Sequence, residues 1–284
     1  KRNLMKAFGR FSLLLPLALF SGAVILDSHI LIGASESRHV LYLRELFILS
    51  ALVLSVPLIS MQKWASDRNV LRGLRSLFFL IVFTYLLLVL SSSRLIDIRE
   101  SLDKDGSIYS SLTFYVLLVS WTFFMGIFIL IILGTLRNLI FIKQRKNTAR
   151  NFHLFLFLLL AYPVLNICRT YVEKYSDNEW PIFDGLNYAF LFLLVLFMVM
   201  NSFRVSWINY LNKKQKLACF WGGLLLLPIQ FHFYHLLRSS NPSAFFSPII
   251  GEFINFGIIF LTIYLNVAFL SLLAHLPTAQ LHDR

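Results

Sequence analysis

Long apolar segments alternate along the chain with short polar connections. A helix that crosses a bilayer needs about 20 consecutive, mostly apolar residues. Eight segments reach this length, and the connections between them are short. The predicted spans are 11–32, 40–62, 76–93, 112–136, 152–172, 181–203, 218–238 and 248–274. The pattern therefore predicts an all-α integral membrane protein, a bundle of eight transmembrane helices.

The composition favours lipid as the solvent. Of the 284 residues, 58% are hydrophobic and only 14% are charged, whereas a soluble domain carries about 25% charged residues. The formal net charge of +12 would favour nucleic acid as a partner of a soluble protein. In a membrane protein an excess of positive charge has a topological explanation, because Lys and Arg are retained on the cytoplasmic side. We therefore expect the bilayer, and no nucleic acid, as a partner.

The basic residues divide unevenly between the two sides of the predicted bundle. If the N-terminus is cytoplasmic, 18 of the 26 basic residues lie on the inner side, and 12 of the 14 acidic residues lie on the outer side. This asymmetry predicts that both termini are cytoplasmic. It also places Cys168 and Cys219 near opposite faces of the membrane, so we expect no disulfide between them.

Prolines and one serine mark helix starts. Pro181 and Pro248 stand where proline is favoured, in the first turn of a predicted helix. Ser247 directly precedes the last predicted span and is expected to cap it.

Ionisable and amide side chains within the predicted spans gather in the outer third of the bundle. Such groups are costly in a membrane and suggest a functional site. Several are separated by three residues, as Glu252 and Asn255 are, which places both on one helix face. We therefore predict an outward-facing polar pocket, closed below by apolar packing. Its predicted lining residues are Arg44, Glu45, Arg169, Asp184, Asn187, His232, His235, Arg238, Glu252 and Asn255.

A structural role for the same residues is the alternative. The arginines can reach the headgroup region, and the carboxylates can pair with them as ion pairs. His232 and His235 supply two ligands, fewer than a metal site requires. We predict no metal and no cofactor.

Motifs of known enzymes are absent from the sequence. We find no Gly-rich phosphate loop, HExxH motif or GxSxG motif. No catalytic residue is therefore predicted within residues 1–284.

The end of the chain, "LLAHLPTAQLHDR", suggests a junction between a membrane domain, 1–274, and a cytoplasmic linker, 275–284. Pro277 ends or kinks the last span because it lacks a backbone N–H, and Thr278 can start a second helix; an ordinary tail is the alternative. The "HLPTA" sequence followed by "DR" resembles the membrane exit of bacterial multi-helix sensor proteins. The resemblance implies an inner-membrane protein, a homodimer, and a GAF, histidine-kinase or SpoIIE-like PP2C-type phosphatase module beyond Arg284 that carries any enzymatic activity.

Three functions follow from these patterns. The leading one is a sensor that binds a small molecule or a lipid in the polar pocket and passes the signal through the last helix, with Pro277 and Thr278 as the coupling residues. A transporter or channel subunit is the second, although the inner halves of the spans offer few polar groups. The third is a lipid-modifying membrane enzyme that uses Glu252, His232 or His235.

Overall fold

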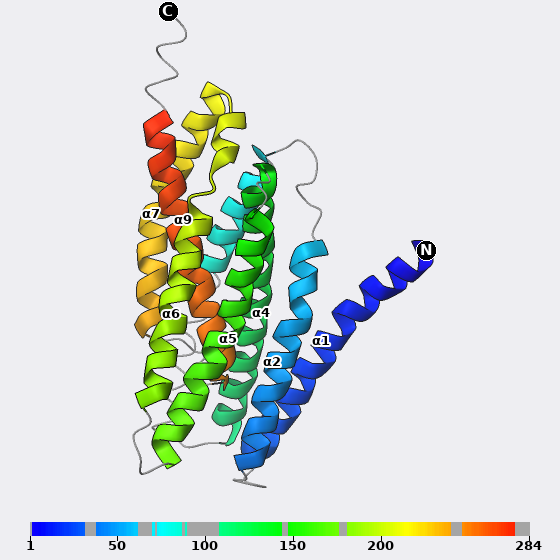
Figure 1. Cartoon of the computed structure of the whole chain (residues 1–284). Helices are drawn as coiled ribbons and strands as arrows, with labels where there is room; N and C mark the ends of the chain where they lie inside the picture. Colours follow the sequence, from blue (N-terminus) through cyan, green and yellow to red (C-terminus); the bar gives the residue numbers. More distant parts are fainter. Residues whose placement is uncertain are drawn as a thin grey trace, which may run out of the picture.

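The regular structure of the described part of the chain is helical throughout. The computed structural model describes residues 2–31, 38–61, 70–71, 73–86, 89, 108–143, 147–175, 181–239 and 246–275. The long helices are α1 (Arg2–Leu31), α2 (Arg38–Met61), α4 (Ile108–Ile140), α5 (Thr148–Tyr175), α6 (Pro181–Ser202), α7 (Lys213–Ser239) and α9 (Pro248–His275) (Figure 1). Two short 3₁₀ helices, η1 (Phe141–Lys143) and η2 (Ser206–Tyr210), follow α4 and α6. A further helix spans Gly73–Leu86.

Several helices meet the requirements for crossing a membrane. Five apolar helical stretches of the described chain are long enough, namely Thr113–Ile140, Thr148–Thr170, Ile182–Tyr210, Lys213–Phe233 and Pro248–His275. Leu14–Ser28 and Gly73–Leu86 are shorter apolar helices. Large apolar side chains cover the outside of the bundle, among them Phe231 and Phe192, which are 79% and 67% exposed. The all-α prediction is confirmed for the described residues, and the exposed apolar surface suits a lipid environment.

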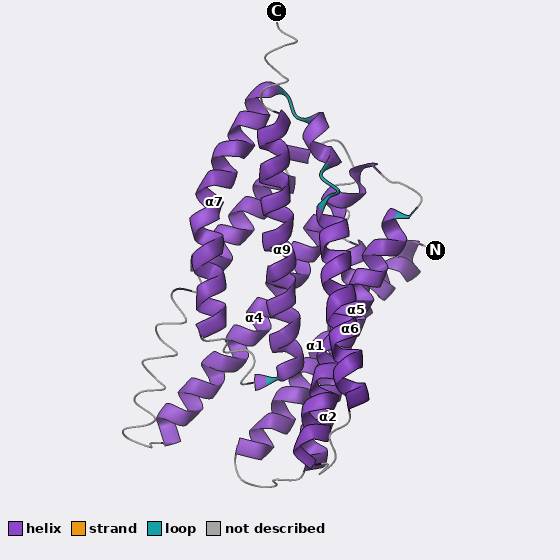
Figure 2. Cartoon of the chain, turned by 60° about the vertical axis from the view of Figure 1, so that its left-hand side comes forward, coloured by secondary structure: helices purple, strands orange, loops and turns teal. Residues whose placement is uncertain are grey.

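Helix α9 lies at the centre of the bundle. It contacts α2, α4, α5, α6 and α7, and Figure 2 shows it with α7 on one side and α5 and α6 on the other. Ile254, Phe260 and Tyr264 are each fully buried on this helix. A helix that is apolar all round is expected to be buried. Helix α9 is therefore the element that runs from one end of the core to the other.

Helices α4 and α9 approach closely at a glycine. A Cβ atom added at Gly257 would lie 2.5 Å from Cγ2 of Ile129, and Ile129 is fully buried. Small residues at helix crossings permit such contacts in membrane proteins. The β-branched side chain of Ile129 has little rotamer freedom in a helix, so the crossing cannot absorb a larger residue at Gly257 without movement.

The end of the bundle where α9 ends is closed by η2. Trp207 Nε1 donates a hydrogen bond of 2.8 Å to the hydroxyl of Tyr264 in α9, and both side chains are buried. The next helix, α7, begins with reciprocal bonds: the Asn212 side chain accepts from the Gln215 N–H, and the Gln215 side chain accepts from the Asn212 N–H. This capping box fixes where α7 starts.

Replacing Gly257 tests the close crossing of α4 and α9. Alanine has a higher helix propensity than glycine by about 1 kcal/mol, so Gly185→Ala, where a Cβ would meet nothing within 4 Å, should leave stability unchanged or raise it. Gly257→Ala should instead lower the free energy of unfolding by about 1–3 kcal/mol, the usual effect of overpacking. Thermal unfolding in detergent micelles measures both. Equal melting temperatures of the two variants would contradict the crossing geometry.

Candidate functional site

The first polar group, the Arg44 cluster, consists of Asp27, Arg44, Glu45 and Ser247. The Arg44 guanidinium pairs with Asp27 of α1 through Nη1 and lies 2.6 Å from Glu45 Oε1 through Nη2. The three charged side chains are each about nine-tenths buried. The Ser247 hydroxyl donates a hydrogen bond of 2.5 Å to the other Glu45 oxygen, Oε2. The cluster therefore joins α1 and α2 to the residue that precedes α9.

Ser247 caps α9, as the sequence predicts. The N–H of Gly251 donates to the Ser247 carbonyl at 3.0 Å, and the N–H of Ile250 lies 3.5 Å from the Ser247 hydroxyl oxygen. The Glu45 carboxylate thus holds the capping hydroxyl at the positive end of the α9 dipole, where a negative charge is stabilising. This arrangement gives Arg44 and Glu45 a structural role, because their charged groups are already paired with other groups of the protein.

The second group, the Glu252 cluster, consists of Asn166, Asn187 and Glu252 and joins α5, α6 and α9. Asn166 Nδ2 donates to Glu252 Oε1 at 3.3 Å, and Asn187 Nδ2 lies 3.5 Å from Asn166 Oδ1. One helical turn from these groups, toward the middle of the bundle, the Tyr162 ring packs edge-on against Phe256, with ring centroids 4.9 Å apart. The cluster is therefore a chain of amides that ends on a carboxylate.

The Tyr162 side chain also contacts Asn187, but one buried acceptor of the Glu252 cluster remains without a donor. Oδ1 of Asn187 is buried and has no hydrogen-bond partner. No Lys, Arg or His in the described part of the chain forms an ion pair with Glu252. Buried acceptors normally have a partner. The cluster can accordingly accept hydrogen bonds from a ligand that carries N–H or O–H groups, and its carboxylate favours a cationic one.

Arg169 and Asp184 lie one helical turn from the Glu252 cluster, toward the end of the bundle where α9 begins. Arg169 Nε is 2.6 Å from Asp184 Oδ1, close enough for an ion pair although not aligned as a hydrogen bond. Both side chains are partly exposed, at 28% and 45%, and the guanidinium carbon of Arg169 lies 5.9 Å from the centre of the Tyr188 ring. Because Arg169 follows Asn166 by three residues and Asp184 precedes Asn187 by three, the pair lies on the same helix faces as the two asparagines.

The remaining predicted site residues do not join either cluster in the described structure. His232 is exposed on α7, and its Nδ1 lies 2.6 Å from the hydroxyl of Tyr85 in the helix Gly73–Leu86. Asn255 is half-buried on α9, and no hydrogen bond ties its side chain to the described residues. The side chains of His235 and Arg238, and all of Pro277 and Thr278, lie outside what the structure describes.

Asp27, Asn166 and Ser247 belong to the two clusters but are absent from the predicted lining residues. Asn166 precedes Arg169 by three residues, the same spacing that singled out the predicted pairs, so the sequence contained the signal. Ser247 was predicted as a cap only. Its bond to Glu45 depends on how α2 and α9 pack, which the local sequence does not determine.

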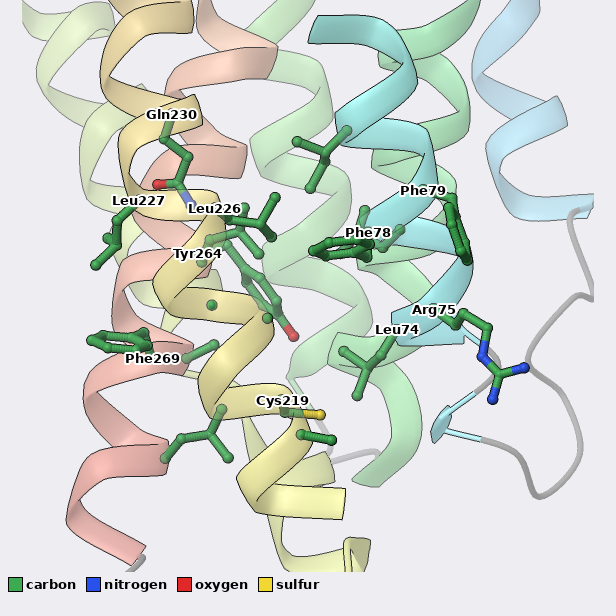
Figure 3. A pocket seen from close by; sticks show the side chains of 18 of the residues that line it. Leu74, Arg75, Phe78, Phe79, Cys219, Leu226, Leu227, Gln230, Tyr264 and Phe269 are labelled. Carbon is green, nitrogen blue, oxygen red and sulfur yellow. The ribbon is translucent and has the colours of Figure 1, made fainter. Parts of the chain in front are cut away.

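Two cavities lie at the other end of the bundle, and no predicted site residue lines either. A cleft of about 430 Å³ lies between the helix Gly73–Leu86, α7 and α9, and η2 contributes Trp207 (Figure 3). A second cavity of about 460 Å³ lies around η2 and includes Arg204 and His275. Among the described residues, no three His, Cys, Asp or Glu side chains are grouped as metal ligands would be.

Comparison of the chain with protein-family models, curated proteins and solved structures finds no match. The two polar clusters and helix α9, which both of them contact, are the features of the described structure that bear on function.

Removing Arg44 tests how the first cluster is held together. Arg44→Met leaves two buried carboxylates without their cation, so the free energy of unfolding should fall by about 3–5 kcal/mol, as expected for an orphaned buried charge. The exposed Arg150 on α5 provides the matched control, and Arg150→Met should leave stability nearly unchanged. Adding Asp27→Asn and Glu45→Gln to Arg44→Met should restore most of the lost stability, because no buried charge then remains unpaired. Chemical denaturation in micelles measures the stability of all three variants. If the triple variant is as unstable as Arg44→Met alone, the account of the cluster is wrong.

Proposed function

We propose that the chain is the membrane-embedded sensor region of a bacterial inner-membrane signalling protein, with eight transmembrane helices and both termini in the cytoplasm. The five long apolar helices, the two shorter ones and the excess of basic residues on one side of the predicted bundle support this arrangement. In this orientation the Arg44 and Glu252 clusters lie in the outer part of the bundle. The cleft and η2 then lie in the inner part.

The observation that carries the sensor proposal is the position of α9. Ser247 and Glu252, at the start of this helix, belong to the two polar clusters. Tyr264, farther along the same helix, holds η2 through Trp207. A ligand bound at Glu252 thus acts directly on the helix that reaches the cytoplasmic end. In the proposed protein, Pro277 and Thr278 pass the displacement of α9 to the output module.

The chemistry of the Glu252 cluster defines the ligand class. The free acceptors on Asn187 and Glu252 fit a small molecule or lipid headgroup with N–H or O–H donors, most simply one with a positive charge. To reach them, the ligand separates Arg169 from Asp184 or enters beside this pair. The ligand shifts the bundle between two arrangements only if it binds one of them more tightly than the other.

Mostly apolar packing along the middle of α9, interrupted by the hydrogen bond from Asn266 to Gln230, favours a sensor over a transporter or channel. The rings of Phe155 and Phe260 pack against each other at a tilt in this region, with centroids 4.4 Å apart, and both side chains are fully buried. A transport path needs polar groups or water near the midplane. The separate contacts of His232 and Glu252, with Tyr85 and Asn166 respectively, likewise give no support to an enzyme that would use the two together.

The output module and the oligomeric state belong to the same proposal. The resemblance of residues 275–284 to sensor membrane exits supports a GAF, kinase or phosphatase module after Arg284. Because such modules commonly act as dimers, we propose a homodimer.

Reporter fusions test the proposed topology. Fusions after Lys146 and after Lys216 should report a cytoplasmic location, because both connections are basic. A fusion after Asp103 should report an external location. An alkaline phosphatase and green fluorescent protein pair at each site gives the measurement. A cytoplasmic signal at Asp103 would reverse the orientation of both clusters.

Glu252→Gln tests whether the free carboxylate sets the signal. The glutamine oxygen can still accept from Asn166, so melting temperature should change little, whereas the loss of charge should shift the activity of the output module. Glu45→Gln is the matched control: it weakens a fully partnered cluster and should lower the melting temperature. Output activity and thermal unfolding of the complete protein, measured side by side, separate the two effects. Unchanged output in Glu252→Gln would argue against the proposed ligand site.

An insertion after Ala279 tests the coupling by α9. One added residue rotates everything downstream by about 100° while lengthening a helix by about 1.5 Å, so output should become locked on or off. Four added residues bring the downstream segment back to within about 40° of its original orientation around the helix axis and should partly restore regulation. If both variants respond like the parent, residues 275–284 are a passive linker.

A further inference from the structure

The cleft between the helix Gly73–Leu86, α7 and α9 has the size and lining of a ligand site. Its volume of about 430 Å³ falls within the range of about 300–1,000 Å³ that is usual for small-molecule sites. Phe78 and Phe269 form opposite walls (Figure 3). Phe79 and Ala218 at its edge are exposed, so the cleft opens to the surface of the bundle.

Two adjacent glycines of α7 shape the cleft in different ways. A Cβ at Gly223 would lie 2.8 Å from Cδ2 of Phe269, so this glycine permits the contact of α7 with α9. A Cβ at Gly222 would meet nothing closer than the Phe78 ring at 3.9 Å. Gly222 therefore leaves space that the packing of the helices does not require.

A buried hydroxyl lines this apolar cleft. Tyr264 is fully buried, and Figure 3 shows its hydroxyl pointing from α9 toward the space between α7 and the helix Gly73–Leu86. The oxygen accepts a hydrogen bond from Trp207, but the hydroxyl proton has no acceptor among the described residues. A phenol can donate and accept at once, and a buried donor without a partner is costly. The cleft therefore offers a hydrogen-bond donor to an oxygen atom that the protein does not supply.

Arg75 adds a positive charge at the rim of the cleft. Its side chain is exposed, and no carboxylate of the described residues pairs with it. Figure 3 shows its guanidinium extending away from α7 at the surface of the helix Gly73–Leu86. An acidic group at the surface of the bundle complements this charge.

We propose that the cleft binds one acyl chain of an acidic phospholipid from the cytoplasmic leaflet. The chain lies between Phe78 and Phe269, an ester oxygen accepts the Tyr264 proton, and the phosphate lies near Arg75. This assignment depends on the membrane orientation proposed above. In that orientation the mouth of the cleft faces the cytoplasmic leaflet, which is rich in anionic lipids and where basic pockets between helices bind acidic headgroups.

The two cysteines of the chain provide the measurement. Cys219 lines the cleft, whereas Cys168 is exposed on α5 and lies outside it. The full chain in dodecyl maltoside micelles is treated with N-ethylmaleimide, and labelling of each cysteine is followed by mass spectrometry. Palmitoyl-oleoyl phosphatidylglycerol at about ten times its dissociation constant should slow labelling of Cys219 about tenfold, by simple occupancy. Cys168 should label at an unchanged rate. Phosphatidylcholine with the same acyl chains should protect less.

Matched variants separate the chain-binding and headgroup contributions. Gly222→Leu fills the cleft and should abolish the effect of phosphatidylglycerol, whereas Gly185→Leu, on the open surface of α6, should keep it. Arg75→Gln should make phosphatidylglycerol and phosphatidylcholine equally protective. The control Lys214→Gln, an exposed position at the start of α7, should keep the preference. Because Arg75 is exposed, its variant tests the proposal even if Gly222→Leu does not fold.

Four outcomes would overturn the proposal. Cys219 labelling that is insensitive to phosphatidylglycerol would exclude lipid in the cleft, and protection that persists in Gly222→Leu would place the lipid elsewhere. Equal slowing of Cys168 would indicate a bulk effect of lipid on the reaction. Protection that rises with protein concentration alone would identify a second copy of the chain as the occupant. The assay needs no output module, so its failure is distinguishable from failure of the sensor proposal.

Discussion

A charge buried in an apolar helix bundle needs a partner from the protein, because neither lipid nor the core can solvate it. Arg44 has two partners, Asp27 and Glu45, and the second of these also holds the hydroxyl of Ser247. One arginine therefore determines how α1 and α2 meet the start of α9. Removing Arg44 would leave two buried carboxylates without their cation, which is why this one side chain matters most in the cluster.

The same requirement has a different outcome at Glu252. Here the neighbours are amides rather than cations, so hydrogen-bonding capacity remains on Glu252 and Asn187. The contrast separates a structural cluster from a candidate binding cluster within the same end of the bundle. Both clusters act on α9, and the close crossing at Gly257 and the hydrogen bond that Tyr264 accepts from Trp207 anchor that helix farther along. A ligand that changes the first turns of α9 therefore acts on an element that is packed along its whole length.

Local sequence predicted the features that depend on a single helix. Apolar length predicted the helices, Pro181 and Ser247 predicted where α6 and α9 begin, and depth along the spans predicted that polar residues gather near one end. Partner choice was not predictable in this way. Whether Arg44 pairs with Asp27 or with a carboxylate of another helix depends on helix order and rotation, which no local pattern encodes. The contact of His232 with Tyr85 and the cleft beside Gly222 depend on the same tertiary arrangement.

Hydrogen–deuterium exchange in a Ser247→Ala variant tests the central claim, that α9 connects the polar clusters to η2, most directly. The substitution removes the hydroxyl that links Glu45 to the start of α9 without touching η2. Amide exchange should become faster in the first turn of α9 and also in Ser206–Tyr210, while the middle of α6 keeps the exchange rate of the parent. Faster exchange confined to the first turn of α9 would show that the two ends of the helix behave independently, and would contradict the account.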